Sequence, residues 1–153
     1  MGFRKGQAAL DFLMTYGWAI ALVVIIAAVL FSLGIFDVTN FIGSKAAGFS
    51  GVGVTGWRLD PGGVLYMKLV NEVGQPISVN SVNATISGVT QENPVAITPA
   101  TLGTGEMSNQ INIPGFANST AGTGYTAQVV ITYVDKSSGF NYTTTGTLTG
   151  KST

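Results

Sequence analysis

Few side chains in this sequence could carry out acid–base or nucleophilic chemistry. It contains seven carboxylates and seven basic residues but no histidine and no cysteine. Imidazole-based proton transfer, thiol nucleophiles, disulfides and histidine–cysteine zinc sites are therefore excluded. The later carboxylates follow no calcium-loop spacing, and we interpret them as solvated turn residues: Asp60, Glu72, Glu92, Glu106 and Asp135. An enzyme is the function class supported least, and we expect no metal or cofactor.

Two further features bear on ligand binding. The formal net charge is zero and only 9% of residues are charged, so the protein lacks the basic surface that nucleic acid requires. Residues Gly51–Gly56 match the GxGxxG pattern of dinucleotide sites, which needs a helix immediately afterwards. Because Trp57, Arg58 and Leu59 instead continue as an expected strand, we interpret the glycines as a flexible joint.

Three Asn-x-Ser/Thr sequons mark candidate N-glycosylation sites at Asn83, Asn118 and Asn141. Strands and turns rich in threonine produce such triplets by chance, which is the simpler interpretation of each one. An exported domain would favour a glycan on at least one of them.

The element before these sites is a long apolar run. Residues 12–36 carry no charge, and as a helix they would extend about 37 Å, longer than the ~30 Å hydrocarbon core of a membrane. Arg4 and Lys5 precede the run, which predicts a cytoplasmic N-terminus and export of the remainder. The run is too long for an ordinary secretory signal and lacks an Ala-x-Ala site, so we expect the helix to remain in the mature protein.

After residue 48 the pattern changes to short β-branched runs separated by Gly, Pro, Asn and Ser. Strands are predicted near 49–59, 63–70, 76–87, 94–98, 109–113, 124–134 and 139–149. This number and spacing is typical of an immunoglobulin-like sandwich. The predicted fold class is therefore α+β, with a long N-terminal hydrophobic α-helix followed by an immunoglobulin-like antiparallel β-sandwich. Its core is predicted to include Trp57, Tyr66, Tyr125 and Tyr133, which we interpret as packing residues rather than a sugar-binding platform.

The N-terminal residues combine a basic pair, a Gly6-Gln7 junction, an acidic residue at Asp11 and the uncharged run that begins at Phe12. In this combination the sequence resembles archaeal type IV pilins with a class III signal peptide, a superfamily that includes the archaellins. The resemblance covers residues 4–42; beyond residue 48 it is one of architecture only. Many members have Ser where this sequence has Ala9, and Glu where it has Asp11.

The resemblance implies how the N-terminus is processed and used. A prepilin peptidase would cleave between Gly6 and Gln7, and a pilus assembly platform would move the subunit from the membrane into a filament. Asp11 would then pair with the new α-amino group of a neighbouring subunit, which offsets the cost of each charge in an apolar bundle. The small pairs Gly17/Ala21 and Ala28/Ser32 would allow helices to approach closely, although small residues are common in such helices.

These predictions divide the sequence into a leader (1–6), a hydrophobic helix (7–44), a hinge (45–56) and a β-sandwich head domain (57–153). The expected function is that of a structural, adhesive subunit of a pilus-like filament on the cell surface, self-polymerising through its helix. Two alternatives stay open: an archaellin of a motility filament, and a minor membrane-anchored binding subunit.

Overall fold

The structure is a computed structural model that describes residues 3–33 and 43–153. The chain divides into two compact units, a helical unit (Met1–Val38) and a β-unit (Thr39–Thr153). The coarse prediction of one long apolar helix and an antiparallel β region is confirmed.

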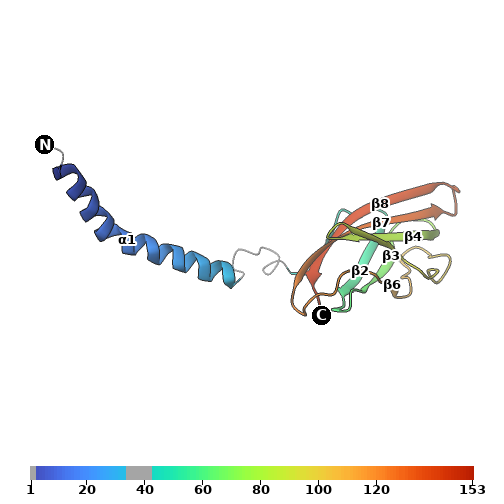
Figure 1. Ribbon diagram of the computed structural model, residues 1–153. Helices are drawn as coiled ribbons and strands as arrows, with labels where there is room; N and C mark the ends of the chain where they lie inside the picture. The colour runs from blue at the N-terminus through green and yellow to red at the C-terminus, as the bar shows by residue number, and fades with distance from the viewer. Residues whose placement is uncertain (1–2, 34–42) are drawn as a thin grey trace. The chain divides into compact units, whose positions relative to one another are not determined.

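The helical unit consists of α1 (Phe3–Ser32) (Figure 1). Its side chains are predominantly apolar on every side, as the uncharged run predicts. The helix starts before the predicted leader boundary, and it ends at Ser32 rather than at residue 44. Residues 43 and 44 are not helical, so the predicted C-terminal limit is wrong; residues 34–42 lie outside the described part.

The β-unit contains two antiparallel sheets. A five-stranded sheet has the order β1-β8-β7-β4-β5, and a three-stranded sheet has the order β2-β3-β6. The strands are β1 (Lys45–Ala47), β2 (Val52–Leu59), β3 (Leu65–Asn71), β4 (Ile77–Ile86), β5 (Val89–Glu92), β6 (Ile111–Ile113), β7 (Gly124–Asp135) and β8 (Asn141–Lys151). Figure 1 shows β7 and β8 side by side as a long hairpin, and their register runs from Gly124↔Lys151 to Val134↔Asn141.

One hydrophobic core takes side chains from both sheets. Alternate residues point inward, so β3 contributes Leu65, Met67 and Leu69 while β7 contributes Val129 and Ile131, all almost fully buried. The two sheets are also joined by a hydrogen bond, in which Trp57 Nε1 of β2 donates to the Thr149 carbonyl of β8 over 3.1 Å. No disulfide supports this core, since the sequence has no cysteine.

Three expectations about the strands differ from the structure. Residues 94–98 do not form a strand; Pro94 begins the segment and Pro99 follows it, and proline cannot donate a ladder hydrogen bond. The second difference is β5, which lies outside the predicted strands. It pairs with β4 across a two-residue turn, in which Ser87 (φ 50°) and Gly88 (φ 82°) both adopt positive φ.

The third difference concerns the expected hinge at 45–56. Residues 45–47 form β1, which pairs with β8, and β2 begins at Val52. The glycine motif Gly51–Gly56 therefore enters a strand, with a register shift between Val54 and Gly56, and no helix follows it. The structure gives these residues none of the strand–turn–helix geometry of a dinucleotide site.

Candidate functional site

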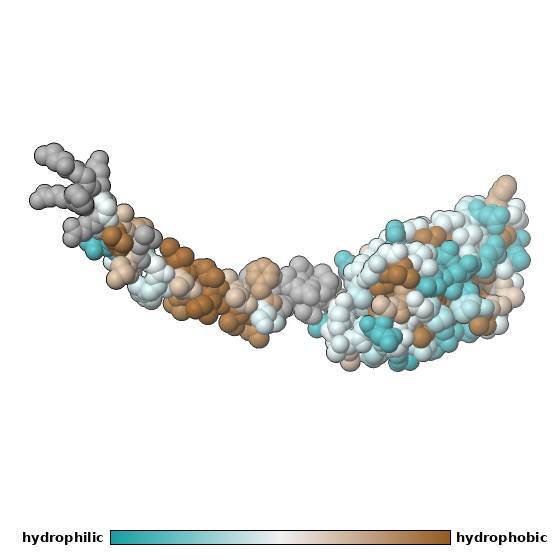
Figure 2. Space-filling view, viewed as in Figure 1, coloured by the Kyte–Doolittle hydropathy of each residue, from teal (hydrophilic) through white to brown (hydrophobic). Residues whose placement is uncertain are grey.

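The most distinctive surface of the protein is that of α1. Its segment Ala9–Ser32 has a mean hydropathy of 2.4, is long and apolar enough to cross a membrane, and has no buried side chains in its most apolar window. Large side chains are exposed on different sides of the axis, including Met14 at 81% and, on the opposite side, Val23 at 64%. Figure 2 shows this as a largely brown surface along the middle of the helix. A helix of this kind requires lipid or other apolar helices around it.

One side of α1 has the shape of a packing surface. Phe12, Tyr16, Ile20 and Val23 follow each other at helical spacing around an apolar hollow of about 380 Å³. The rings of Phe12 and Tyr16 pack against each other with their centroids 4.6 Å apart. Side chains of a second helix could fill such a hollow, as ridges fill grooves in helix pairs.

The predicted processing residues lie in the first turns of α1. Arg4, Lys5 and Gln7 belong to the helix by their backbone, while their side chains lie outside the described part. Gly6 and Asp11 are exposed. The bond between Gly6 and Gln7 is thus inside a helical segment, and Asp11 is less than two turns further along.

The predicted small-residue pairs also lie on the helix surface. Ala21, Ala28 and Ser32 are exposed and Gly17 is half-buried. A Cβ atom added at Gly17 would meet no atom within 4 Å. The space beside Gly17 is therefore available to a neighbouring helix.

The three sequons occupy different environments. Asn83 lies inside β4 between β5 and β7, and its buried Oδ1 has no hydrogen-bond partner among the described residues. Asn118 is exposed in the loop between β6 and β7. Asn141 is exposed at the start of β8, where Asn80 Nδ2 approaches its Oδ1 at 3.5 Å.

We expect any glycan to be attached at Asn118 or Asn141 and not at Asn83, because a transferase needs an exposed, extended acceptor. Intact masses of the wild type and the three single Asn→Gln variants test this. Asn118→Gln or Asn141→Gln should remove one glycan mass from a modified protein, and Asn83→Gln should remove none. A glycan lost only in Asn83→Gln would contradict the prediction.

The carboxylates of the β-unit organise turns. Asp60 Oδ1 accepts the Gly62 N–H at 2.7 Å, and Glu106 Oε2 accepts the Gly103 N–H at 2.7 Å. The Ser137 N–H donates to Asp135 over 2.7 Å and lowers the pKa of this carboxyl. Among the described residues no three His, Cys, Asp or Glu side chains form a group that could hold a metal ion.

Of the four aromatic side chains predicted to lie in the core, three do so. Tyr125 and Tyr133 are buried, and Trp57 packs against the same core. Burial raises the pKa of Tyr125 to about 12 and also raises the pKa of Tyr133, so both remain neutral phenols at ordinary pH. The prediction for Tyr66 is wrong, because Tyr66 is only half-buried on the outer side of β3.

Tyr66 belongs to a polar surface that the sequence patterns did not indicate. On the outer side of the β2-β3-β6 sheet the register places Gly56 opposite Lys68, and Arg58, Tyr66 and Asn112 in one row. Gln110, which immediately precedes β6, lines the same shallow hollow as Lys68. We call the surface formed by Arg58, Tyr66, Lys68, Gln110 and Asn112 the cationic face. Arg58 Cζ lies 4.5 Å from the Tyr66 ring centroid, and Gln110 Nε2 donates to Asn112 Oδ1 over 3.0 Å.

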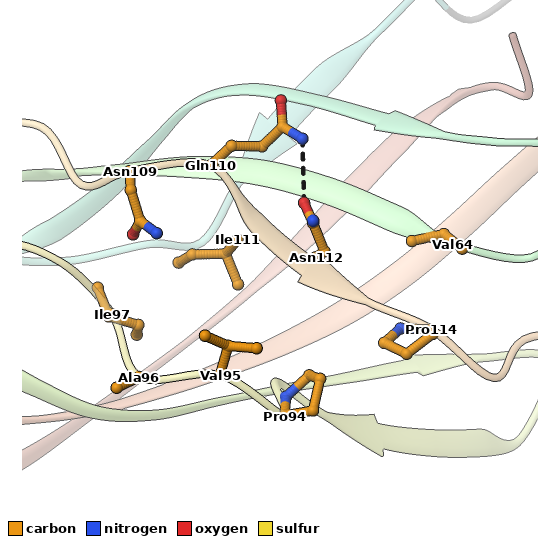
Figure 3. Close-up of a pocket in the computed structure, with 10 residues that line it drawn as sticks. All are labelled: Val64, Pro94, Val95, Ala96, Ile97, Asn109, Gln110, Ile111, Asn112 and Pro114. Carbon is orange, nitrogen blue, oxygen red and sulfur yellow. Dashed lines mark hydrogen bonds between the residues drawn. The ribbon is translucent and has the colours of Figure 1, made fainter.

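A hollow of about 400 Å³ lies between β6 and the loop at 94–97 (Figure 3). Figure 3 shows Ile111, Val95 and Ile97 turned toward one another on one side, while Gln110 and Asn112 point to the other side. The loop is fixed at one end, where Asn109 N–H donates to the Thr98 carbonyl over 2.7 Å and Asn109 Oδ1 accepts the Thr98 N–H. The loop is therefore attached to the residues before β6 by hydrogen bonds at Thr98 rather than along its length as a paired strand.

Comparison with known proteins adds no family assignment. No protein-family model matches the sequence, and no curated protein matches it either. Function is therefore inferred from the surface of α1, its N-terminal residues and the outer surface of the β-unit.

Proposed function

We propose that this protein is a structural subunit of an archaeal type IV pilus-like surface filament. It polymerises through α1 and presents the β-unit, which we take to be an immunoglobulin-like sandwich, for adhesion. The observation that carries the proposal is an α-helix of 30 residues whose apolar segment has no covering side chains among the described residues. Such a surface is stable in a bilayer and equally in a bundle of identical helices.

The N-terminal residues support the same role. The order of basic pair, Gly6, Gln7 and Asp11 before the apolar run is the basis of the resemblance to pilins. In our proposal a prepilin peptidase removes residues 1–6, and an assembly platform transfers the subunit from the membrane to the filament. Glycine costs about 1 kcal/mol relative to alanine inside a helix, so Gly6 weakens the helix locally at the proposed cleavage site.

The proposal places the β-unit outside the cell. Arg4 and Lys5 keep the N-terminus cytoplasmic, so everything that follows α1 is exported and the precursor spans the membrane once. In a filament every subunit presents one β-unit, and many weak contacts along it add to a strong attachment. The two small pairs of α1 would form the close contacts between packed helices.

Shearing cells and analysing the released filaments tests the proposed function. We predict that this protein is the major component of the filaments and that its deletion abolishes surface attachment. Trace amounts in the filaments would indicate a minor binding subunit instead. Loss of swimming with attachment intact would indicate an archaellin.

A further inference from the structure

We propose that the cationic face binds an acidic polysaccharide, with the Arg58 guanidinium and the Lys68 ammonium group as its carboxylate-binding groups. The inference deepens the adhesive role proposed above by naming the class of ligand. It does not depend on filament assembly, because the whole cationic face lies within one β-unit.

The two cationic side chains of this face take part in no ion pair within the described part of the protein. Arg58 and Lys68 are exposed, and neither forms an ion pair with a carboxylate of the described residues. The strand register makes them diagonal neighbours, because Arg58 is opposite Tyr66 and Lys68 is two residues further along β3. Two adjacent positive charges of this kind attract an anion with more than one carboxylate.

Arg58 is also held in place. The Cζ atom of its guanidinium lies over the Tyr66 ring, 4.5 Å from the ring centroid, and the guanidinium donates no hydrogen bond to another described residue. Five N–H donors therefore remain for an incoming ligand, in the planar arrangement that suits a carboxylate. The stacking reduces the conformational freedom that Arg58 loses on binding.

The remaining groups and the shape of the surface favour a sugar polymer. The Gln110 and Asn112 amides can donate to and accept from hydroxyl groups. A shallow hollow of about 240 Å³ lies beside Gly56, where an added Cβ would meet no atom within 4 Å. Gln110, next to β6, lines this hollow, so the hollow borders the two amides as well as the two cationic side chains. A nucleic acid would require a wider basic surface than two side chains.

The test uses the full-length protein in micelles of a polyoxyethylene detergent, with sodium polygalacturonate as the probe and dextran as a neutral polymer. We expect the wild type to bind polygalacturonate and not dextran, and to bind more weakly as salt rises. Arg58→Gln/Lys68→Gln should weaken binding roughly tenfold or more. The control Lys136→Gln/Lys151→Gln removes the same charge from exposed positions elsewhere on the β-unit and should change affinity by less than about twofold.

Two further variants separate the geometry from the charge. Arg58→Lys keeps the charge but loses the planar fork, and Tyr66→Leu removes the stacking partner; each should weaken binding with an unchanged melting temperature. Any of three results would overturn the proposal. The two double variants could lower the affinity equally, the wild type could bind dextran as tightly as polygalacturonate, or it could fail to bind polygalacturonate. Because the protein in micelles is unassembled, these results are independent of whether filaments form.

Discussion

Replacing Asp11 with asparagine is expected to abolish filaments while the precursor still accumulates in the membrane. Asparagine preserves the size of the side chain but removes its charge. In the proposed filament the α-amino group of a neighbouring subunit, created by cleavage before Gln7, would then be buried without a partner. Breaking a buried ion pair in this way costs about 3–5 kcal/mol, which corresponds to a roughly hundredfold or greater weakening of the association constant of each subunit contact.

The measurement is the amount of subunit in sheared filaments relative to the membrane fraction. Asp11→Glu restores the carboxylate and should restore filaments, although the longer side chain alters the reach. Thr15→Ala changes another exposed polar residue of α1 and should leave the yield unaffected. Normal filaments formed by Asp11→Asn would show that Asp11 is only an interfacial helix residue.

Replacing Gly63 with alanine is expected to produce the largest loss of stability in the β-unit. Gly63 has a φ of 78°, and an added Cβ would collide with the backbone carbonyl of Phe116. The left-handed conformation costs about 1–2 kcal/mol for a residue with a side chain. Displacing backbone in a packed region adds about 1–3 kcal/mol. We therefore expect the free energy of unfolding to fall by roughly 3 kcal/mol or more.

The change would also disturb the loop that carries Asn118. Phe116 N–H donates to the Gly63 carbonyl over 3.1 Å, and Ser119 N–H donates to the Pro61 carbonyl over 3.0 Å. These bonds attach the loop to the turn between β2 and β3. Loss of this support should increase proteolysis around Asn118 in the folded protein.

Gly88→Ala is the matched control for this stability prediction. Gly88 has a similar φ of 82°, but an added Cβ there would meet no atom within 4 Å. Thermal unfolding followed by the circular dichroism of the strands should show a fall in Tm of roughly 10 °C or more for Gly63→Ala and a clearly smaller fall for Gly88→Ala. Equal falls would mean that the close approach to Phe116 contributes nothing.

The long elements of this protein could be predicted from local patterns. The uncharged run of α1 indicates a helix by its length, and the alternation of Val129, Ile131 and Tyr133 indicates β7. Residues 94–98 show the limit of such patterns. Their apolar content reflects burial of Ile97 in an irregular loop, and burial alone does not distinguish a loop from a strand.

The short strands depend on distant partners. Nothing in Lys45–Ala47 predicts β1, which is ordered by pairing with β8 about a hundred residues later. The cationic face had a partial signal in β3, where Leu65, Met67 and Leu69 alternate with Tyr66 and Lys68. Together with the predicted turn at 60–63, that alternation places Arg58 beside Tyr66 and Lys68. The part of the face next to β6 could not be predicted in this way, because β6 pairs with β3 from more than forty residues further along the sequence.

The central claim is that this protein is cleaved after Gly6 and then assembled through its helix. The most direct test is to determine the N-terminal residue of the protein recovered from sheared surface filaments. We predict a start at Gln7. A start at Met1, with the protein remaining in the membrane fraction, would contradict the claim, because the protein would then be a single-pass anchored β-domain and Asp11 would have no α-amino group to pair with.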